Sequence, residues 1–65
     1  MKKLLPVEVK STPRPSGKDL RSMDLFLDTY ANASFGIVVC TCQRPRALSA
    51  RILALPITWL YVLTH

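Results

Sequence analysis

The chain has 65 residues and a net charge of +5, and almost half of its residues are hydrophobic. This length allows one small domain, which would bury only about 60% of the surface of its unfolded chain, so its core is marginal. The hydrophobic content excludes a disordered chain. Cys40 and Cys42 are too close in sequence to form the disulfide framework that stabilises many small domains.

The positive charge is concentrated in the first third of the chain. Residues 1–21 carry six basic side chains against two acidic ones, whereas the remainder is almost balanced. Such a segment is compatible with nucleic acid, but charge alone describes non-specific attraction and solubility. A solvated basic edge is the simpler interpretation.

No part of the sequence has the pattern of a secretory signal or a transmembrane helix. Pro6 and Glu8 end the apolar run near the N-terminus too early for a signal peptide. The apolar run at residues 52–64 is interrupted by Pro56 and is shorter than the roughly 20 residues that a membrane span needs. Free cysteines without an export signal suit a reducing compartment. We therefore expect a cytoplasmic protein without a membrane partner.

Residues 4–10 have the alternating pattern of a β-strand. One face would carry Leu5, Val7 and Val9, and the other would carry Leu4, Glu8 and Lys10. Residues 11–17 are rich in proline, serine and glycine, which is typical of a loop.

Residues 18–31 are expected to form a helix. Ser16 is a candidate N-cap, with Asp19 as its capping-box partner three residues later. One stripe at helical spacing is apolar and consists of Leu20, Met23, Phe26, Leu27 and Tyr30. The helix should end near Asn32, a residue type that tolerates a left-handed cap.

Residues 35–42 are β-branched and apolar on both faces, which is typical of a buried parallel strand. Together with the preceding strand and helix they predict a βαβ unit, and hence an α/β fold. A turn follows at residues 43–46, and then a short strand at residues 51–55. Pro56 is expected to open a short helix or turn over residues 57–63.

The Glu8-Val9-Lys10 segment is the sharpest chemical feature. Residues two apart on a strand project to the same face, so the carboxylate and the ammonium group should lie side by side. A carboxylate can bind Mg²⁺, and a neighbouring lysine can stabilise phosphate charge or polarise a water molecule. This is half of the site of a metal-dependent phosphodiesterase, although most such pairs are surface ion pairs worth about 0–1 kcal/mol.

The order of the motifs resembles the PD-(D/E)xK nuclease-like superfamily. More narrowly, it is similar to the C-terminal domain of unknown function that follows the ATPase domain of many prokaryotic AAA+ ATPases. The resemblance covers roughly residues 4–60. The matching segments are Pro6-Val7-Glu8-Val9-Lys10, Arg21-Ser22-Met23 with Phe26, Leu27 and Tyr30, the strand from Gly36 to Cys40, and Ala54-Leu55-Pro56 with Trp59.

The resemblance implies a partial restriction-endonuclease-like βαβ unit, with residues 1–65 forming a single, partial nuclease-like domain. Glu8 and Lys10 would then be vestigial catalytic residues, Glu8 would be the metal ligand, and Arg21 would be a secondary candidate for contacting phosphate. The superfamily's other metal-binding carboxylate lies on an upstream strand, which this chain lacks. Magnesium is expected only if that site is completed, and ATP binding would belong to the ATPase domain.

Other polar residues have simpler explanations. Lys18 is expected to be a solvated residue at the helix start, whereas Arg21 remains open between a solvated and a phosphate-binding role. Cys40 and Cys42 lack a second pair of ligands, so buried structural thiols are preferred over a metal site. Arg44, Arg46 and Arg51 could contact phosphate, but basic residues around a proline turn are usually a solvated face.

Three hypotheses follow. The first is a C-terminal fragment of an ATPase-associated nuclease-like domain without catalysis of its own. The second is a small metal-dependent nuclease that a partner or an oligomer completes. The third is a protein-interaction module in which a partner or a second copy covers the apolar C-terminus.

Overall fold

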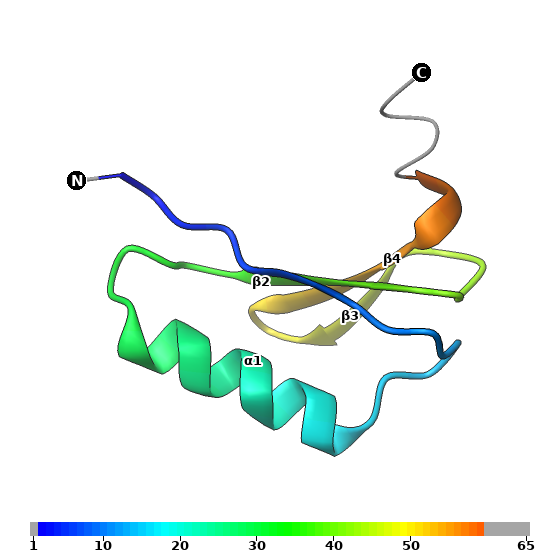
Figure 1. Ribbon diagram of the computed structural model, residues 1–65, viewed down its shortest axis with the longest axis horizontal. Helices are drawn as coiled ribbons and strands as arrows, with labels where there is room; N and C mark the ends of the chain where they lie inside the picture. Colours follow the sequence, from blue (N-terminus) through cyan, green and yellow to red (C-terminus); the bar gives the residue numbers. More distant parts are fainter. Residues whose placement is uncertain (1, 60–65) are drawn as a thin grey trace.

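A computed structural model describes residues 2–59, which form one helix and four strands. In chain order these are β1 (Val7–Val9), α1 (Gly17–Thr29), β2 (Gly36–Cys40), β3 (Arg46–Ser49) and β4 (Ile52–Pro56). The strands make one sheet in the order β1-β2-β4-β3. Helix α1 lies along one face of this sheet, as Figure 1 shows.

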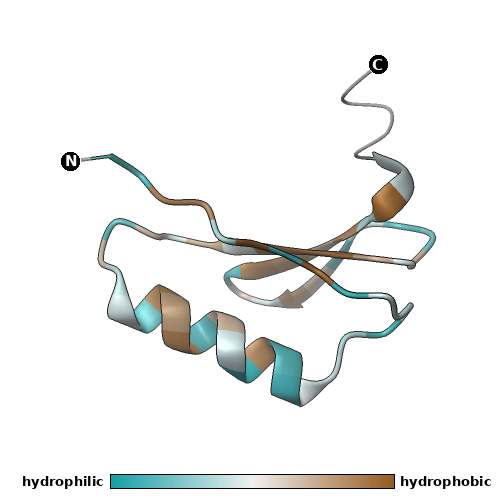
Figure 2. Ribbon diagram, viewed as in Figure 1, coloured by the Kyte–Doolittle hydropathy of each residue, from teal (hydrophilic) through white to brown (hydrophobic). Residues whose placement is uncertain are grey.

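The predicted α/β class and the parallel strand–helix–strand unit are confirmed. Strand β1 pairs in parallel with β2, with Val7 opposite Ile37 and Val9 opposite Val39. Strand β4 pairs in parallel with the other edge of β2. Strand β2 therefore lies in the interior of the sheet, and its residues are apolar and mostly buried on both faces. Figure 2 shows the hydrophobic character of β2 and β4.

The first strand is shorter than the predicted residues 4–10. Leu4 makes an isolated parallel bridge to Ala33, and the continuous strand begins only at Val7. Pro6 lies between them. Its carbonyl accepts the Ile37 amide at 3.0 Å, but its nitrogen has no hydrogen to donate to β2. Proline therefore divides the predicted strand into a bridge and a three-residue strand.

Helix α1 begins one residue before the predicted start and ends at Thr29 instead of residue 31. The predicted capping interaction is present, because the Asp19 carboxylate accepts the Ser16 amide at 2.9 Å. The left-handed cap predicted near Asn32 is wrong: Tyr30 ends the helix in an extended conformation, and no residue among 2–59 has a positive φ. Asn32 instead donates its side-chain amide to the Lys2 carbonyl at 2.6 Å.

The sequence did not predict β3. Its residues, Arg46-Ala47-Leu48-Ser49, lack the β-branched and aromatic types that favour strands, and Arg46 falls in the turn predicted at residues 43–46. Strand β3 pairs antiparallel with β4, and the register shifts between Ala47 and Ser49. Leu48 lies at this irregularity and packs against the core.

Two other boundaries differ from the prediction. Strand β2 covers Gly36–Cys40 instead of residues 35–42, because the Thr41 amide turns away to donate to the Thr12 carbonyl at 3.1 Å. Strand β4 extends to Pro56, which therefore does not open a helix. The helical turn begins at Ile57, and the predicted residues 60–63 lie outside the described part of the chain.

Pro56 is tolerated in β4 because of the direction of its nitrogen. The Gly36 amide donates to the Arg51 carbonyl at 2.8 Å, so odd-numbered residues of β4 direct their backbone groups toward β2. The backbone nitrogen of Pro56 therefore points toward the β3 side. Strand β3 pairs with β4 only from Arg46, opposite Ala54, so no residue of β3 lies opposite Pro56. The missing N–H group removes no hydrogen bond from the sheet.

The core lies between α1 and the sheet. Its buried residues are Met23, Leu27, Ala33, Val38 and Ile52, and Leu20, Phe26 and Leu48 pack against them. Met23 approaches the backbone of β2 most closely: a Cβ atom built on Gly36 would lie 2.9 Å from its Cγ and even closer to its sulfur. The absence of a side chain at Gly36 thus allows α1 to approach the sheet.

We expect Gly36→Ala to lower the free energy of unfolding by about 1–3 kcal/mol, because the added methyl group overlaps the buried Met23 side chain. Urea denaturation followed by circular dichroism would measure the change. Gly17→Ala is the matched control, since nothing lies within 4 Å of its added Cβ and alanine suits the first turn of α1. Equal stability of Gly36→Ala and wild type would contradict this account of the packing.

Candidate functional site

The two residues of the Glu-x-Lys motif lie side by side, as the strand spacing predicts. Glu8 is opposite Val38 in the sheet, and Val38 is part of the core beneath α1, so both motif side chains project to the helix-covered face. The Lys10 Nζ lies 3.1 Å from the Glu8 Oε1. The side chains remain about one-third exposed, so the pair is accessible to solvent.

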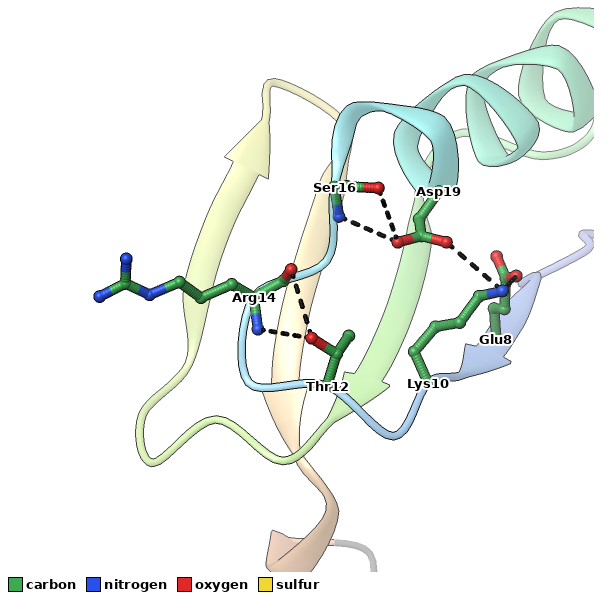
Figure 3. Close-up of polar contacts among 6 residues, drawn as sticks. All are labelled: Glu8, Lys10, Thr12, Arg14, Ser16 and Asp19. Carbon is green, nitrogen blue, oxygen red and sulfur yellow. Dashed lines mark hydrogen bonds and ion pairs between the residues drawn. The ribbon is translucent and has the colours of Figure 1, made fainter.

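A third side chain completes this cluster. The Lys10 Nζ lies 3.4 Å from Oδ1 of Asp19, in the first turn of α1, and Figure 3 shows the Lys10 side chain reaching toward both carboxylates. Sequence reasoning assigned Asp19 only to the helix cap. The sequence nevertheless contained a signal that Asp19 lies near Lys10. Asp19 is in the first turn of the helix, and the loop between Lys10 and the helix start is short. We call Glu8, Lys10 and Asp19 the carboxylate–lysine cluster.

The surroundings of the cluster stabilise the charged form of each member whose pKa is shifted. The Ser16 backbone amide lowers the pKa of Asp19 most, and Lys10 lowers it further. The hydrogen bond to Glu8 raises the pKa of Lys10 most, and the bond to Asp19 raises it further. Lys10 is consequently an ammonium ion at neutral pH, which can neutralise anions but cannot accept a proton.

The arrangement does not fit the magnesium site that the resemblance implies. Magnesium needs carboxylate oxygens directed at one point, together with water or phosphate oxygens. The Lys10 ammonium group lies where a cation between Glu8 and Asp19 would have to bind. Among residues 2–59, no three His, Cys, Asp or Glu side chains come together in a way that could hold a metal ion.

Arg21 is not part of this cluster. Its side chain is exposed, and no ion pair joins it to another residue of the described chain. The geometry gives it no partner that would position it for phosphate contact.

A second ionic cluster connects α1 to the turn between β3 and β4. The Arg51 guanidinium lies 3.0 Å from Asp24 Oδ1 and 2.9 Å from Asp28 Oδ1. The solvated role expected for Arg51 was therefore wrong, because the β3–β4 hairpin that brings this turn to the helix was not predicted. Hydrogen bonds to these carboxylates, Asp28 first, raise the pKa of Arg51.

The two cysteines lie together at the end of β2. Their sulfur atoms are 2.9 Å apart, Cys40 is completely buried and Cys42 is half-buried. Burial raises the pKa of the Cys42 thiol, and the neighbouring Cys40 raises it further. A protonated thiol is a poor nucleophile and a poor metal ligand, so a packing role accounts for this pair better than chemistry does.

Comparison with protein-family models, with curated proteins and with solved structures finds no match to this chain. The functional argument therefore depends on the residues and on their geometry.

The shifted pKa of Asp19 predicts a loss of stability in acid. Because its pKa is lower in the folded protein than in the unfolded chain, ionised Asp19 stabilises the fold above roughly pH 4, and this contribution is lost as the pH falls through the folded pKa. We expect Asp19→Asn to be less stable than wild type at pH 7 and equally stable near pH 2. Urea denaturation across this range would measure both.

A Lys10→Met variant serves as the companion to this experiment. It removes the ammonium group and keeps most of the side-chain length. In the Lys10→Met background, Asp19→Asn should lower the free energy of unfolding at pH 7 by less than it does in wild type. The effect should not vanish, because the Ser16 amide still donates to Asp19. The explanation fails if Asp19→Asn destabilises the protein equally at both pH values.

Proposed function

We propose that this chain is a nuclease-like α/β unit of the ATPase-associated type, that it does not cleave nucleic acid by itself, and that it acts by binding a protein partner. The observation that carries the proposal is the contact of one ammonium group, that of Lys10, with both Glu8 and Asp19. The residues that would bind metal are thereby used to join β1 to α1.

The order of the elements supports the nuclease-like assignment. A strand with the Glu-x-Lys motif is followed by a helix and by a buried parallel strand, and the two strands are neighbours in the sheet. This is the arrangement that the motif order implies. The helix residues of the resemblance, Met23 and Leu27, belong to the core.

The chemistry supports the absence of catalysis. Hydrolysis of a phosphodiester by such a site requires a metal ion that activates water and neutralises the developing charge. Here each carboxylate is already bound by the cationic lysine, and Asp19 also accepts the Ser16 amide. Phosphate would be repelled by the two carboxylates, because the cluster carries a net charge of −1 in spite of Lys10.

ATP binding lies outside the proposed role. In the family that the chain resembles, a separate ATPase domain carries the nucleotide. Here the pair Gly17-Lys18 lacks both the earlier glycine and the following Ser or Thr of a phosphate-binding loop. Gly17 instead begins α1 directly after its Ser16 cap.

Among the described residues, no strand pairs with the outer edge of β1, and this edge supports a protein partner. Leu4 and Lys10 donate their amides to Asn32 and Val39. The backbone groups of the alternate residues, Leu5, Val7 and Val9, therefore point away from β2. The side chains of these three residues are 49%, 52% and 59% exposed. An exposed strand edge with apolar side chains is a template for adding another strand.

We propose that the added strand comes from a second copy of this chain, paired antiparallel about Val7. In that pairing Leu5 of one copy lies opposite Val9 of the other, so the backbone groups and the apolar side chains both find partners. The sequence predicts that a partner or an oligomer covers the apolar C-terminus, most of which lies outside residues 2–59. Ile57 and Trp59, the described part of it, are 45% and 46% exposed and could extend such a surface.

The proposed location is the reducing cytoplasm, because the neighbouring thiols of Cys40 and Cys42 are free. Within the described residues, no helix has the length and apolar character needed to cross a membrane.

We expect the purified protein to leave plasmid and single-stranded DNA intact in the presence of Mg²⁺ or Mn²⁺, because Lys10 competes with metal for both carboxylates. Agarose gel electrophoresis over time measures cleavage. Metal-dependent cleavage by wild type that is lost in Glu8→Gln would overturn the proposal and support a nuclease completed by a partner or by oligomerisation. Cleavage that persists in Glu8→Gln would indicate a contaminating enzyme.

We expect wild type to form a concentration-dependent dimer through β1, and Val9→Lys to be monomeric, because a charge on the strand edge blocks pairing. Sedimentation velocity over a range of concentrations would measure this. Leu25→Lys is the matched control, since Leu25 is 68% exposed on α1, away from the strand edge, and should leave the dimer unchanged. A wild type that is monomeric at every concentration would refute the proposed partner.

A further inference from the structure

The distribution of ion pairs leaves one part of the protein with unbalanced positive charge. The chain has four acidic side chains, and all four are used: Glu8 and Asp19 bind Lys10, while Asp24 and Asp28 bind Arg51. Within residues 2–59, no ion pair involves any of the other seven of the nine basic residues. They are Lys2, Lys3, Arg14, Lys18, Arg21, Arg44 and Arg46.

Three of these seven residues line one cavity. Arg14, Arg44 and Arg46 surround an open space of about 410 Å³, which we call the arginine pocket. The polar groups of Thr41 and Gln43 also line it, together with Pro13 and Cys42. No acidic residue lines the pocket. Arginine side chains that line one space without a counter-charge are able to bind an anion there.

The pocket is built from two segments that are held together. The Thr41 amide, directly after β2, donates to the Thr12 carbonyl in the loop after β1 at 3.1 Å. Within that loop the Thr12 hydroxyl oxygen accepts the Arg14 amide at 3.2 Å. Pro13, Pro15 and Pro45 restrict the backbone beside the arginines. These contacts hold the backbone of the loop after β1 beside the segment after β2 before a ligand binds, which lowers the entropic cost of bringing the arginines together.

The pocket is separate from the carboxylate–lysine cluster. Figure 3 shows that Arg14 extends away from Glu8, Lys10 and Asp19, although one loop connects the two sites. The pocket lies beyond the carboxyl ends of the parallel strands β1 and β2, the edge at which open α/β sheets bind ligands. The two sites differ in charge, since the cluster is negative and the pocket is positive.

From these observations we infer that the arginine pocket binds a phosphate-bearing ligand through Arg14, Arg44 and Arg46. Arginine presents a planar fork of donors that matches phosphate oxygens, and three arginines can neutralise two adjacent phosphate groups. Thr41 and Gln43 add neutral donors to the same space. The inference needs neither catalysis nor the proposed nuclease-like ancestry, because it depends only on this pocket and its charge.

The test uses two probes that carry the same chemistry from different sources. Inorganic pyrophosphate is titrated by calorimetry, and a short fluorescein-labelled single-stranded oligonucleotide is titrated by fluorescence anisotropy, both at low salt. We expect at least one probe to bind wild type. Binding of pyrophosphate assigns the pocket to a small phosphate compound, whereas binding of the oligonucleotide alone assigns it to a nucleic acid backbone, with affinity that falls as salt is added.

Matched variants separate the pocket from general charge. Arg44→Gln/Arg46→Gln should weaken binding by about tenfold or more, because each lost contact is a charge-assisted hydrogen bond. Lys2→Gln/Lys3→Gln removes the same charge far from the pocket and should weaken binding by less than about threefold. Arg14→Gln provides a second pocket variant if the double variant does not fold. Absence of binding by wild type, or equal weakening by both double variants, would overturn the inference.

Discussion

The fold depends on the packing of α1 against one face of the sheet. Only four carboxylates in the chain are available for ion pairs, and three of them connect α1 to the sheet or its turns. Asp19 connects the first turn of α1 to Lys10 at the end of β1, and Asp24 and Asp28 connect the middle and end of α1 to Arg51 beside β4. These pairs are partly exposed, so each contributes little to stability. Burial of Met23, Leu27, Val38 and Ile52 supplies most of the stabilisation, and the ion pairs add weak contacts between α1 and the sheet.

The small number of carboxylates also determines how charge is distributed over the surface. Three carboxylates belong to α1 and the fourth, that of Glu8, lies on the helix-covered face of the sheet. None lines the arginine pocket, which lies where the loops after β1 and β2 touch. The motif that first suggested phosphate chemistry therefore belongs to a cluster with a net negative charge. The residues that first suggested a solvated face, Arg44 and Arg46, form the positive site. The negative cluster and the arginine-lined pocket are thus separate sites on one small sheet.

Much of the fold could be predicted from the sequence, because its strongest signals are local. The β-branched run at β2, the apolar stripe of α1 and the Ser16–Asp19 cap each identify an element without reference to the rest of the chain. Strand β3 could not be predicted, because its weakly strand-forming residues are ordered by pairing with β4. The interruption at Pro6 and the extension of β4 to Pro56 depend on which side of each strand is paired, a property that only the sheet order determines.

The candidate sites show the same division between local and tertiary information. Strand spacing predicts the Glu8–Lys10 pair, but Asp19 joins it only because the loop after β1 brings the helix start back over the strand. The sequence around Arg51 does not distinguish it from Arg44 and Arg46. The β3–β4 hairpin brings Arg51 to Asp24 and Asp28, whereas Arg44 and Arg46 line the pocket without an acidic partner there. In a basic chain with four acidic residues, which cations remain unpaired is decided by tertiary structure. Binding sites for anions are for that reason found by accounting for every carboxylate, and a cluster of arginines in the sequence does not suffice.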